Sequence, residues 1–81
     1  MTVTVKLYGN LKRYAPNKKE MTQMQANEGT TIRSLLLALG VPDNHWWMAA
    51  VNDQVVDDTT ILKDGDQVEV FEPVGGGALI R

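Results

Sequence analysis

The sequence predicts an α+β fold: one mixed sheet of four to five strands with a single helix packed across one face. The chain has 81 residues, which is enough for one small domain. Its segments follow in the order strand, strand, helix, strand, strand, strand. Because one helix cannot cover both faces of a sheet, a two-layer arrangement is the economical one. The second face is then left open to solvent or to a partner.

The first two strands are predicted to form a hairpin. Over residues 2–8, valine or leucine occupies every second position, which indicates a half-buried strand. Residues 21–27 alternate more weakly, with Met24 and Ala26 as the apolar positions. The intervening residues 11–20 carry several lysines and an arginine, and we expect them to form an exposed connection.

The helix is predicted over residues 32–39, where apolar residues recur at i, i+3, i+4 and i+7. Thr30 and Thr31 precede it and supply an N-cap. Gly40 stands where a left-handed C-cap is required, and Pro42 prevents continuation. The apolar stripe consists of Ile32, Leu35, Leu36 and Leu39.

Three further strands are predicted in the second half of the chain. They cover residues 46–52, 54–56 and 67–72, and turns are expected at Asn52-Asp53 and at residues 63–66. The apolar faces of all elements should meet in one core. Its predicted members are Val3, Val5, Leu7, Ile32, Leu35, Leu36, Leu39, Val51, Ile61, Leu62, Val68 and Val70.

Composition excludes several classes of function. The formal net charge of −2 argues against a nucleic-acid partner, which usually requires a basic face. No apolar run approaches the roughly 20 residues that span a bilayer, and the N-terminus lacks the pattern of a signal peptide. We therefore expect a cytoplasmic protein without a membrane partner. The chain has no cysteine and one histidine, His45, so we expect no metal site. Asp64 and Asp66 should act as turn formers rather than metal ligands.

The C-terminal residues carry the main functional signal. Three consecutive glycines, Gly75–Gly77, cannot stabilise a helix or strand, so we predict a domain over residues 1–74 and a flexible tail over residues 75–81. From Val74 to Gly77 the backbone could extend about 13 Å. Glycines thread narrow channels and leave a terminal carboxylate open to adenylation. The alternative interpretation is a frayed chain end.

Three segments together resemble the small subunit of molybdopterin synthase and, through it, the MoaD/ThiS family of ubiquitin-like sulfur carriers. They are residues 49–52 (AAVN), 63–68 (KDGDQV) and 71–77 (FEPVGGG). The family ends in phenylalanine, a variable residue, proline, valine, a variable residue and two glycines. In this frame Gly76 and Gly77 are the functional pair and Gly75 is the variable position. The N-terminal half matches the family in element order and length.

The resemblance implies a β-grasp fold and a carrier rather than an enzyme. An E1-like enzyme would use ATP to adenylate Gly77, and a sulfur donor would convert it to a thiocarboxylate. The recipient would be the molybdopterin-synthase large subunit or another sulfur-accepting synthase. No bound cofactor is implied, since ATP is used by the partner. The residues expected to bind these partners are Phe71, Pro73, Val74, Gly75 and Gly76.

The chain departs from the family after Gly77, where it continues with residues 78–81. As written, Gly77 has no free carboxylate. A tail-cleaving peptidase would therefore have to remove residues 78–81 first; if the cut fell after Gly76, that residue would be the acceptor. Two alternatives stay open: a ubiquitin-like protein modifier, and a non-covalent β-grasp binding module with an inert tail.

Three aromatic or titratable positions carry separate predictions. Phe71 should face away from the core and could dock on the activating enzyme or the synthase, although a single exposed apolar residue is ordinary. Trp46 and Trp47 should point opposite ways, one into the core and the other toward an edge or a partner. His45 is expected to be a solvated loop residue.

Overall fold

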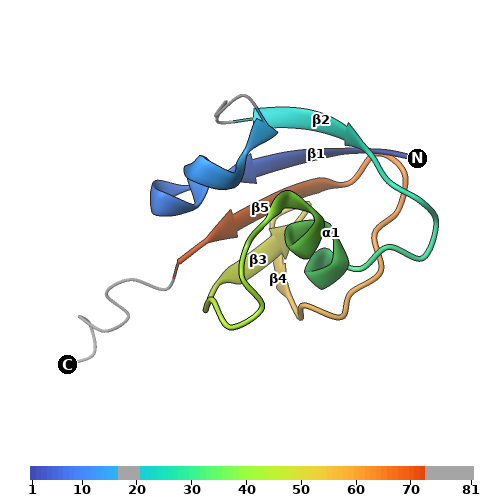
Figure 1. Cartoon of the computed structure of the whole chain (residues 1–81). Helices are drawn as coiled ribbons and strands as arrows, with labels where there is room; N and C mark the ends of the chain where they lie inside the picture. The colour runs from blue at the N-terminus through green and yellow to red at the C-terminus, as the bar shows by residue number, and fades with distance from the viewer. Residues whose placement is uncertain (17–20, 73–81) are drawn as a thin grey trace.

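The computed structural model describes residues 1–16 and 21–72. Within them, a five-stranded mixed sheet in the order β2-β1-β5-β3-β4 carries one α-helix (Figure 1). This is the β-grasp arrangement that the resemblance implies, and the predicted element order is confirmed. The elements are β1 (Thr2–Leu7), the 3-10 helix η1 (Gly9–Tyr14), β2 (Met21–Gln25), α1 (Ile32–Leu39), β3 (Met48–Val51), β4 (Gln54–Val56) and β5 (Gln67–Phe71).

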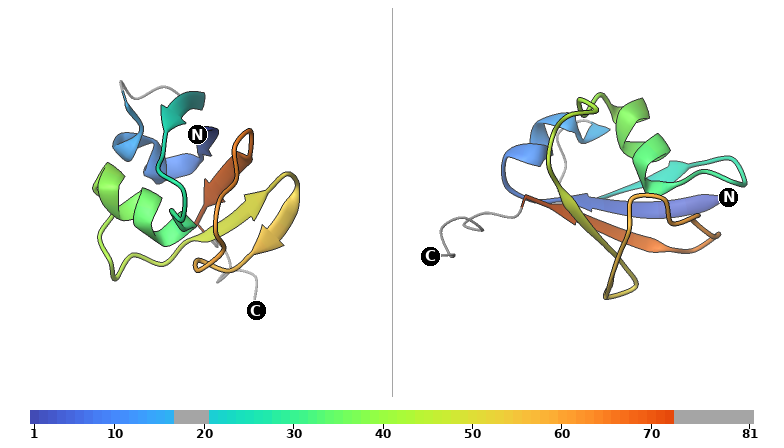
Figure 2. Two further views of the ribbon diagram at one scale, coloured as in Figure 1. Left: turned by 90° about the vertical axis from the view of Figure 1, so that its right-hand side faces the viewer. Right: turned by 90° about the horizontal axis from the view of Figure 1, so that it is seen from below.

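The first and last strands lie side by side at the centre of the sheet. β1 and β5 are parallel, with Thr4 opposite Gln67 and Leu7 opposite Val70, whereas the other pairs are antiparallel. Both α1 and η1 lie on the same side of the sheet (Figure 2). The C-terminal end of β5 therefore emerges beside the end of β1, next to a sheet face that no described helix covers.

The helix begins and ends where its capping residues predict. The side chain of Thr31 accepts a hydrogen bond from the Ser34 amide at 3.1 Å, which satisfies one of the free donors of the first turn. Gly40 has a φ of 101°, a left-handed conformation that suits glycine, and its amide bonds back to the last turn. Ile32, Leu35 and Leu36 are buried against the sheet.

The predicted turns are also confirmed. Asn52 and Asp53 have φ values of 50° and 73° in the tight turn between β3 and β4. Asp66 is only 8% exposed and accepts a hydrogen bond from Asn52 Nδ2 at 3.0 Å. Asp64 accepts from the Thr2 amide at 2.7 Å. Both aspartates therefore act as turn formers that connect to neighbouring strands.

The expected exposed connection over residues 11–20 is wrong for its first part. Leu11 is fully buried and Ala15 is 8% exposed, because η1 folds back over the helix side of the sheet. Ile61 is also misassigned: it is 59% exposed and bridges to Thr31, whereas the next residue, Leu62, is buried. Consecutive residues of an extended segment point opposite ways, so only one of the pair can enter the core.

The core otherwise follows the prediction, with Leu39 and Val51 packed at its margin rather than inside it. Across residues 1–16 and 21–72, no helix is long and apolar enough to cross a membrane. The buried core consists of Val3, Val5, Leu7, Leu11, Ala15, Ile32, Leu35, Leu36, Val41, Ala49, Leu62, Val68 and Val70.

Candidate functional site

The sheet face opposite α1, here called the open face, carries aromatic and apolar side chains at the C-terminal end of β5. The strand register places Met48 opposite Phe71, and Lys6 opposite Glu69. Because side chains alternate across a strand, these residues point away from the core positions Val68 and Val70. The open-face residues at this end are Lys6, Tyr8, Met48, Ala50, Val55, Glu69 and Phe71.

Tyr8 organises this end of the open face. Its ring meets the Phe71 ring edge-on, with centroids 6.4 Å apart and planes at 67°. Its hydroxyl donates to Glu69 Oε2 at 3.0 Å, and Lys6 Nζ lies 5.0 Å from the ring centroid. Edge-to-face pairs favour a fixed geometry. Phe71 therefore lies on the predicted face, but it is half-buried by Tyr8 rather than fully open to solvent.

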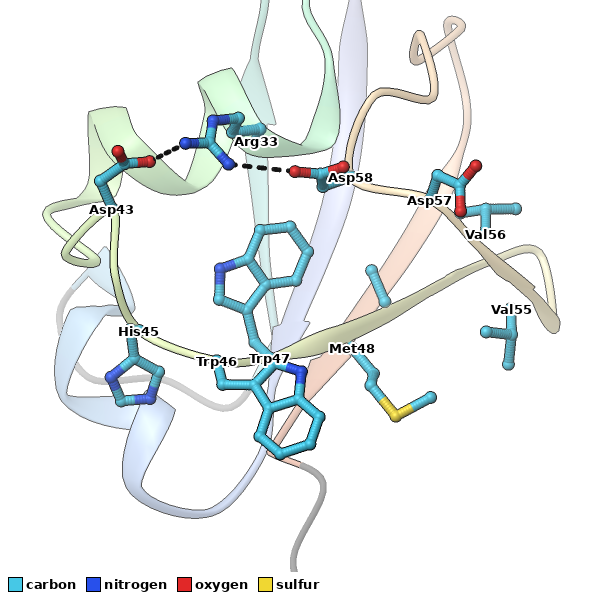
Figure 3. A pocket seen from close by; sticks show the side chains of 11 residues that line it. Arg33, Asp43, His45, Trp46, Trp47, Met48, Val55, Val56, Asp57 and Asp58 are labelled. Atoms are coloured by element: carbon cyan, nitrogen blue, oxygen red, sulfur yellow. Dashed lines mark hydrogen bonds and ion pairs between the residues drawn. The ribbon is translucent and has the colours of Figure 1, made fainter. Parts of the chain in front are cut away.

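Exposed apolar side chains continue from this end toward the β4 edge. Trp46 is 75% exposed, Val55 65% and Met48 37%. Trp47, in contrast, packs against the core. Figure 3 shows the Trp47 ring on the side of Arg33 and the Trp46 ring on the other side, as predicted for the adjacent pair. Such clustered apolar exposure is typical of an interaction surface.

The last described residue is fixed by a contact that the sequence does not predict. Glu72 Oε2 lies 2.8 Å from His45 Nε2, and the His45 ring meets Tyr14 edge-on with centroids 6.4 Å apart. His45 is therefore only partly solvated: its side chain is 28% exposed and is paired with Glu72. The contact connects the loop before β3 to the residue after β5.

The remaining predicted site residues lie outside the described part of the chain. They are Pro73, Val74, Gly75, Gly76 and Gly77, and the proposed boundary between residues 1–74 and 75–81 falls there too. Phe71 is the one predicted site residue that the structure places. Among the residues that the structure describes, no three His, Asp or Glu side chains are grouped so that they could hold a metal ion.

Sequence reasoning missed two parts of this site. The alternation of β1 places Lys6 and Tyr8 outward, and it could have indicated their proximity to Phe71 once a parallel pairing of β1 with β5 was assumed. The His45–Glu72 contact spans 27 residues. No local pattern signals it, because it depends on how the loop after α1 returns to the sheet.

The fold and this surface define a class: a ubiquitin-like β-grasp protein whose chain passes from the central strand into a glycine-rich segment. The model of the ThiS family matches residues 5–77. The chain therefore belongs to the ThiS family, and the resemblance drawn from residues 49–77 is confirmed. The match ends at the second glycine of the predicted functional pair.

Individual proteins are similar to this chain over most of its length. The chain is 32% identical over 65 residues to Protein RnfH of Neisseria meningitidis, covering 73% of this chain and 71% of the relative. A putative molybdopterin converting factor subunit 1 from Pyrococcus furiosus is 26% identical, with a TM-score of 0.71 over 91% of this chain and 99% of that one. The complex of subunits 1 and 2 of the molybdopterin-converting factor from Helicobacter pylori contains a chain that is 28% identical, with a TM-score of 0.62 over 91% and 96%.

Proposed function

We propose that the protein is a sulfur carrier whose acceptor is the main-chain carboxylate of Gly77, and that it serves molybdopterin biosynthesis in the cytoplasm. The observation that carries the proposal is the family match over residues 5–77, which ends at Gly77. The sequence FEPVGGG then occupies the end of that match. In this proposal the protein is a co-substrate and not itself an enzyme, and it binds no cofactor.

The chemistry follows from the poor reactivity of a carboxylate. An E1-like partner would use ATP: a Gly77 carboxylate oxygen attacks the α-phosphorus, pyrophosphate leaves, and an acyl-adenylate forms. A donor supplying sulfur at the sulfide level then attacks the carbonyl carbon and AMP leaves, which gives the thiocarboxylate. When a synthase takes the sulfur, water restores the carboxylate oxygen. The absence of cysteine is compatible with this scheme, because the sulfur is carried on the main chain.

The open face supports docking of such partners beside the chain segment that they act on. Phe71 lies two residues before Pro73, and its ring is held by Tyr8 at the same end of the sheet. Met48 lies opposite Phe71 in the register and is partly exposed. A partner covering this end would contact the residues that directly precede the glycine segment in the sequence. The Helicobacter pylori neighbour, a complex of two subunits, supports the large synthase subunit as one such partner.

Residues 78–81 require a processing step in this proposal. Gly77 is joined to Ala78 by a peptide bond, so hydrolysis of that bond by a peptidase must precede adenylation. The family match supports this position of the cut, because residues 78–81 lie beyond it.

The intact mass of the native, untagged protein from its own cells tests the proposal. We expect a species that ends at Gly77, part of which carries sulfur in place of one terminal oxygen. The control is a sample from cells in which the chain ends at residue 74. It lacks Gly77, so it should show no sulfur-bearing species. If the only species extends past Gly77 while the pathway is active, the carrier proposal is wrong.

A second candidate function is the non-covalent binding module. It is favoured by the peptide bond between Gly77 and Ala78, which leaves Gly77 without a free carboxylate. This candidate predicts that deletion of residues 75–81 leaves function intact, whereas the carrier proposal predicts its loss. A protein modifier would share the adenylation step. It differs by producing larger conjugates in cells that disappear when Gly77 is substituted.

A further inference from the structure

A cavity at the β4 edge of the sheet borders the open face and shares Met48 and Val55 with it. Its volume is about 420 Å³. It opens because β4 is short: Val56, opposite Ala49, is the last β4 residue that pairs with β3. In the part of the chain that the structure describes, the residues before Ala49 have no strand neighbour on that side. The apolar part of the lining is formed by Trp46, Trp47, Met48, Ala49, Val55 and Val56.

The rest of the lining carries an excess of negative charge. It contains three carboxylates, Asp43, Asp57 and Asp58, together with the guanidinium of Arg33 and the ring of His45. Arg33 is bound on both sides, by Asp43 and by Asp58, the latter at 3.1 Å. Within the described residues the Asp57 carboxylate takes part in no hydrogen bond or ion pair. Asp57 is exposed, so its negative charge is available to a basic side chain of a partner.

Part of the apolar lining lies across the cavity from the acidic residues. Figure 3 shows Asp43, Arg33, Asp58 and Asp57 along the upper border, with the Trp46 ring and Met48 along the lower one. An extended peptide directs successive side chains to opposite sides. A segment with alternating basic and apolar residues would thus present each kind of side chain to the matching border.

We propose that this cavity binds an extended segment of a partner protein in which Lys or Arg alternates with apolar residues. Trp46 is the anchor: it is 75% exposed, and tryptophan is enriched among the residues that dominate binding at interfaces. The carboxylates give specificity and steer the basic segment toward the cavity. The inference goes beyond the carrier function, since it needs no sulfur chemistry and no residue after Glu72.

An NMR titration of the isotope-labelled full chain tests the inference without any partner enzyme. The probe is a capped six-residue peptide of alternating leucine and arginine, and the control probe replaces arginine with glutamate. We expect shifts of the Trp46 indole and of the Val55, Val56 and Asp57 amides with the basic probe alone, and weaker binding as salt increases. Equal shifts with both probes, shifts outside the cavity, or no shifts would overturn the inference.

Two substitutions that each remove one negative charge distinguish binding at the cavity from attraction to the net charge of the protein. Asp57→Asn should weaken binding of the basic probe about two- to fivefold, as expected for a partly exposed charge. Asp53→Asn makes the same charge change in the β3–β4 turn outside the cavity, and asparagine tolerates its φ of 73°. Binding by Asp53→Asn should match the unsubstituted protein. Equal weakening by both variants would overturn the inference.

A third substitution tests the proposed anchor. Trp46→Ala should weaken binding of the basic probe about tenfold or more, because it removes the largest exposed apolar surface of the cavity. Its exposure means that the fold should tolerate the change, and the dispersed amide spectrum checks this directly. Unchanged affinity of Trp46→Ala would likewise contradict the inference.

Discussion

His45 Nε2 and Glu72 Oε2 lie 2.8 Å apart, although 27 residues separate them in the sequence. The contact joins the loop that follows α1 to the residue after β5. Glu72 is also the last residue before the segment that the proposed function uses. The contact thereby joins this loop to the end of the central strand, beside the open face.

Substitution of His45 should measure the strength of this contact. His45→Ala removes the hydrogen bond to Glu72 and the edge contact with Tyr14, so the free energy of unfolding should fall by about 1 kcal/mol. Urea denaturation provides the measurement. The neighbouring exposed substitution Asn44→Ala is the control and should leave stability nearly unchanged. Equal effects of the two would show that the contact does not stabilise the fold.

The unexpected burial of Leu11 gives a direct stability prediction. Leu11→Ala should lower the free energy of unfolding by about 2–5 kcal/mol, because it leaves a cavity between η1 and the sheet. Ile61→Ala removes a similar side chain that is 59% exposed, and it should cost less than about 1 kcal/mol. Thermal and urea unfolding of the two variants would measure both losses of stability. The reverse order would contradict the packing described for η1.

The left-handed C-cap of α1 predicts a graded response to substitution. At a φ of 101°, Gly40→Ala strains the backbone and should cost more than about 1 kcal/mol. Gly40→Asn should cost less, since asparagine enters the left-handed region more readily. Urea midpoints of the three proteins test this order. Identical midpoints for glycine and alanine would mean that the cap conformation is not required.

Substitution of Phe71 on the open face should reduce sulfur loading of the protein without a matching loss of stability. Phe71→Ala should reduce the sulfur-bearing fraction in cells about tenfold if Phe71 is an energetically dominant docking residue. Met21→Ala is the matched control, because Met21 lies on the same face at the β2 edge and is 56% exposed. Intact masses give the loaded fraction, and urea unfolding reports stability. Normal loading of Phe71→Ala would exclude Phe71 as a docking residue.

The regular elements could be predicted because their signals are local. Thr31, the stripe starting at Ile32 and Gly40 specify the helix within ten residues, and the Asn52-Asp53 turn specifies the hairpin of β3 and β4. The strand alternation also separated the core face from the open face, including the placement of Phe71. The ending FEPVGGG, at its spacing from the KDGDQV turn, was enough to indicate the family.

The errors arose where burial depends on distant segments. The basic composition around Leu11 suggested exposure, yet η1 turns this leucine toward the sheet and into the core. Ile61 and Leu62 are equally apolar, and their order does not indicate that Leu62 is buried while Ile61, which bridges to Thr31, is exposed.

The element order, the helix caps, the two-layer architecture and the glycine segment could all be inferred from the amino-acid sequence, because each follows from side-chain periodicity or backbone preference over a few residues. The tertiary structure decided the Tyr8–Phe71 pair, the His45–Glu72 contact and the acidic border around Arg33. These contacts join residues that lie far apart in the chain. Their geometry depends on the parallel pairing of β1 with β5 and on the loops around α1, which local patterns do not encode.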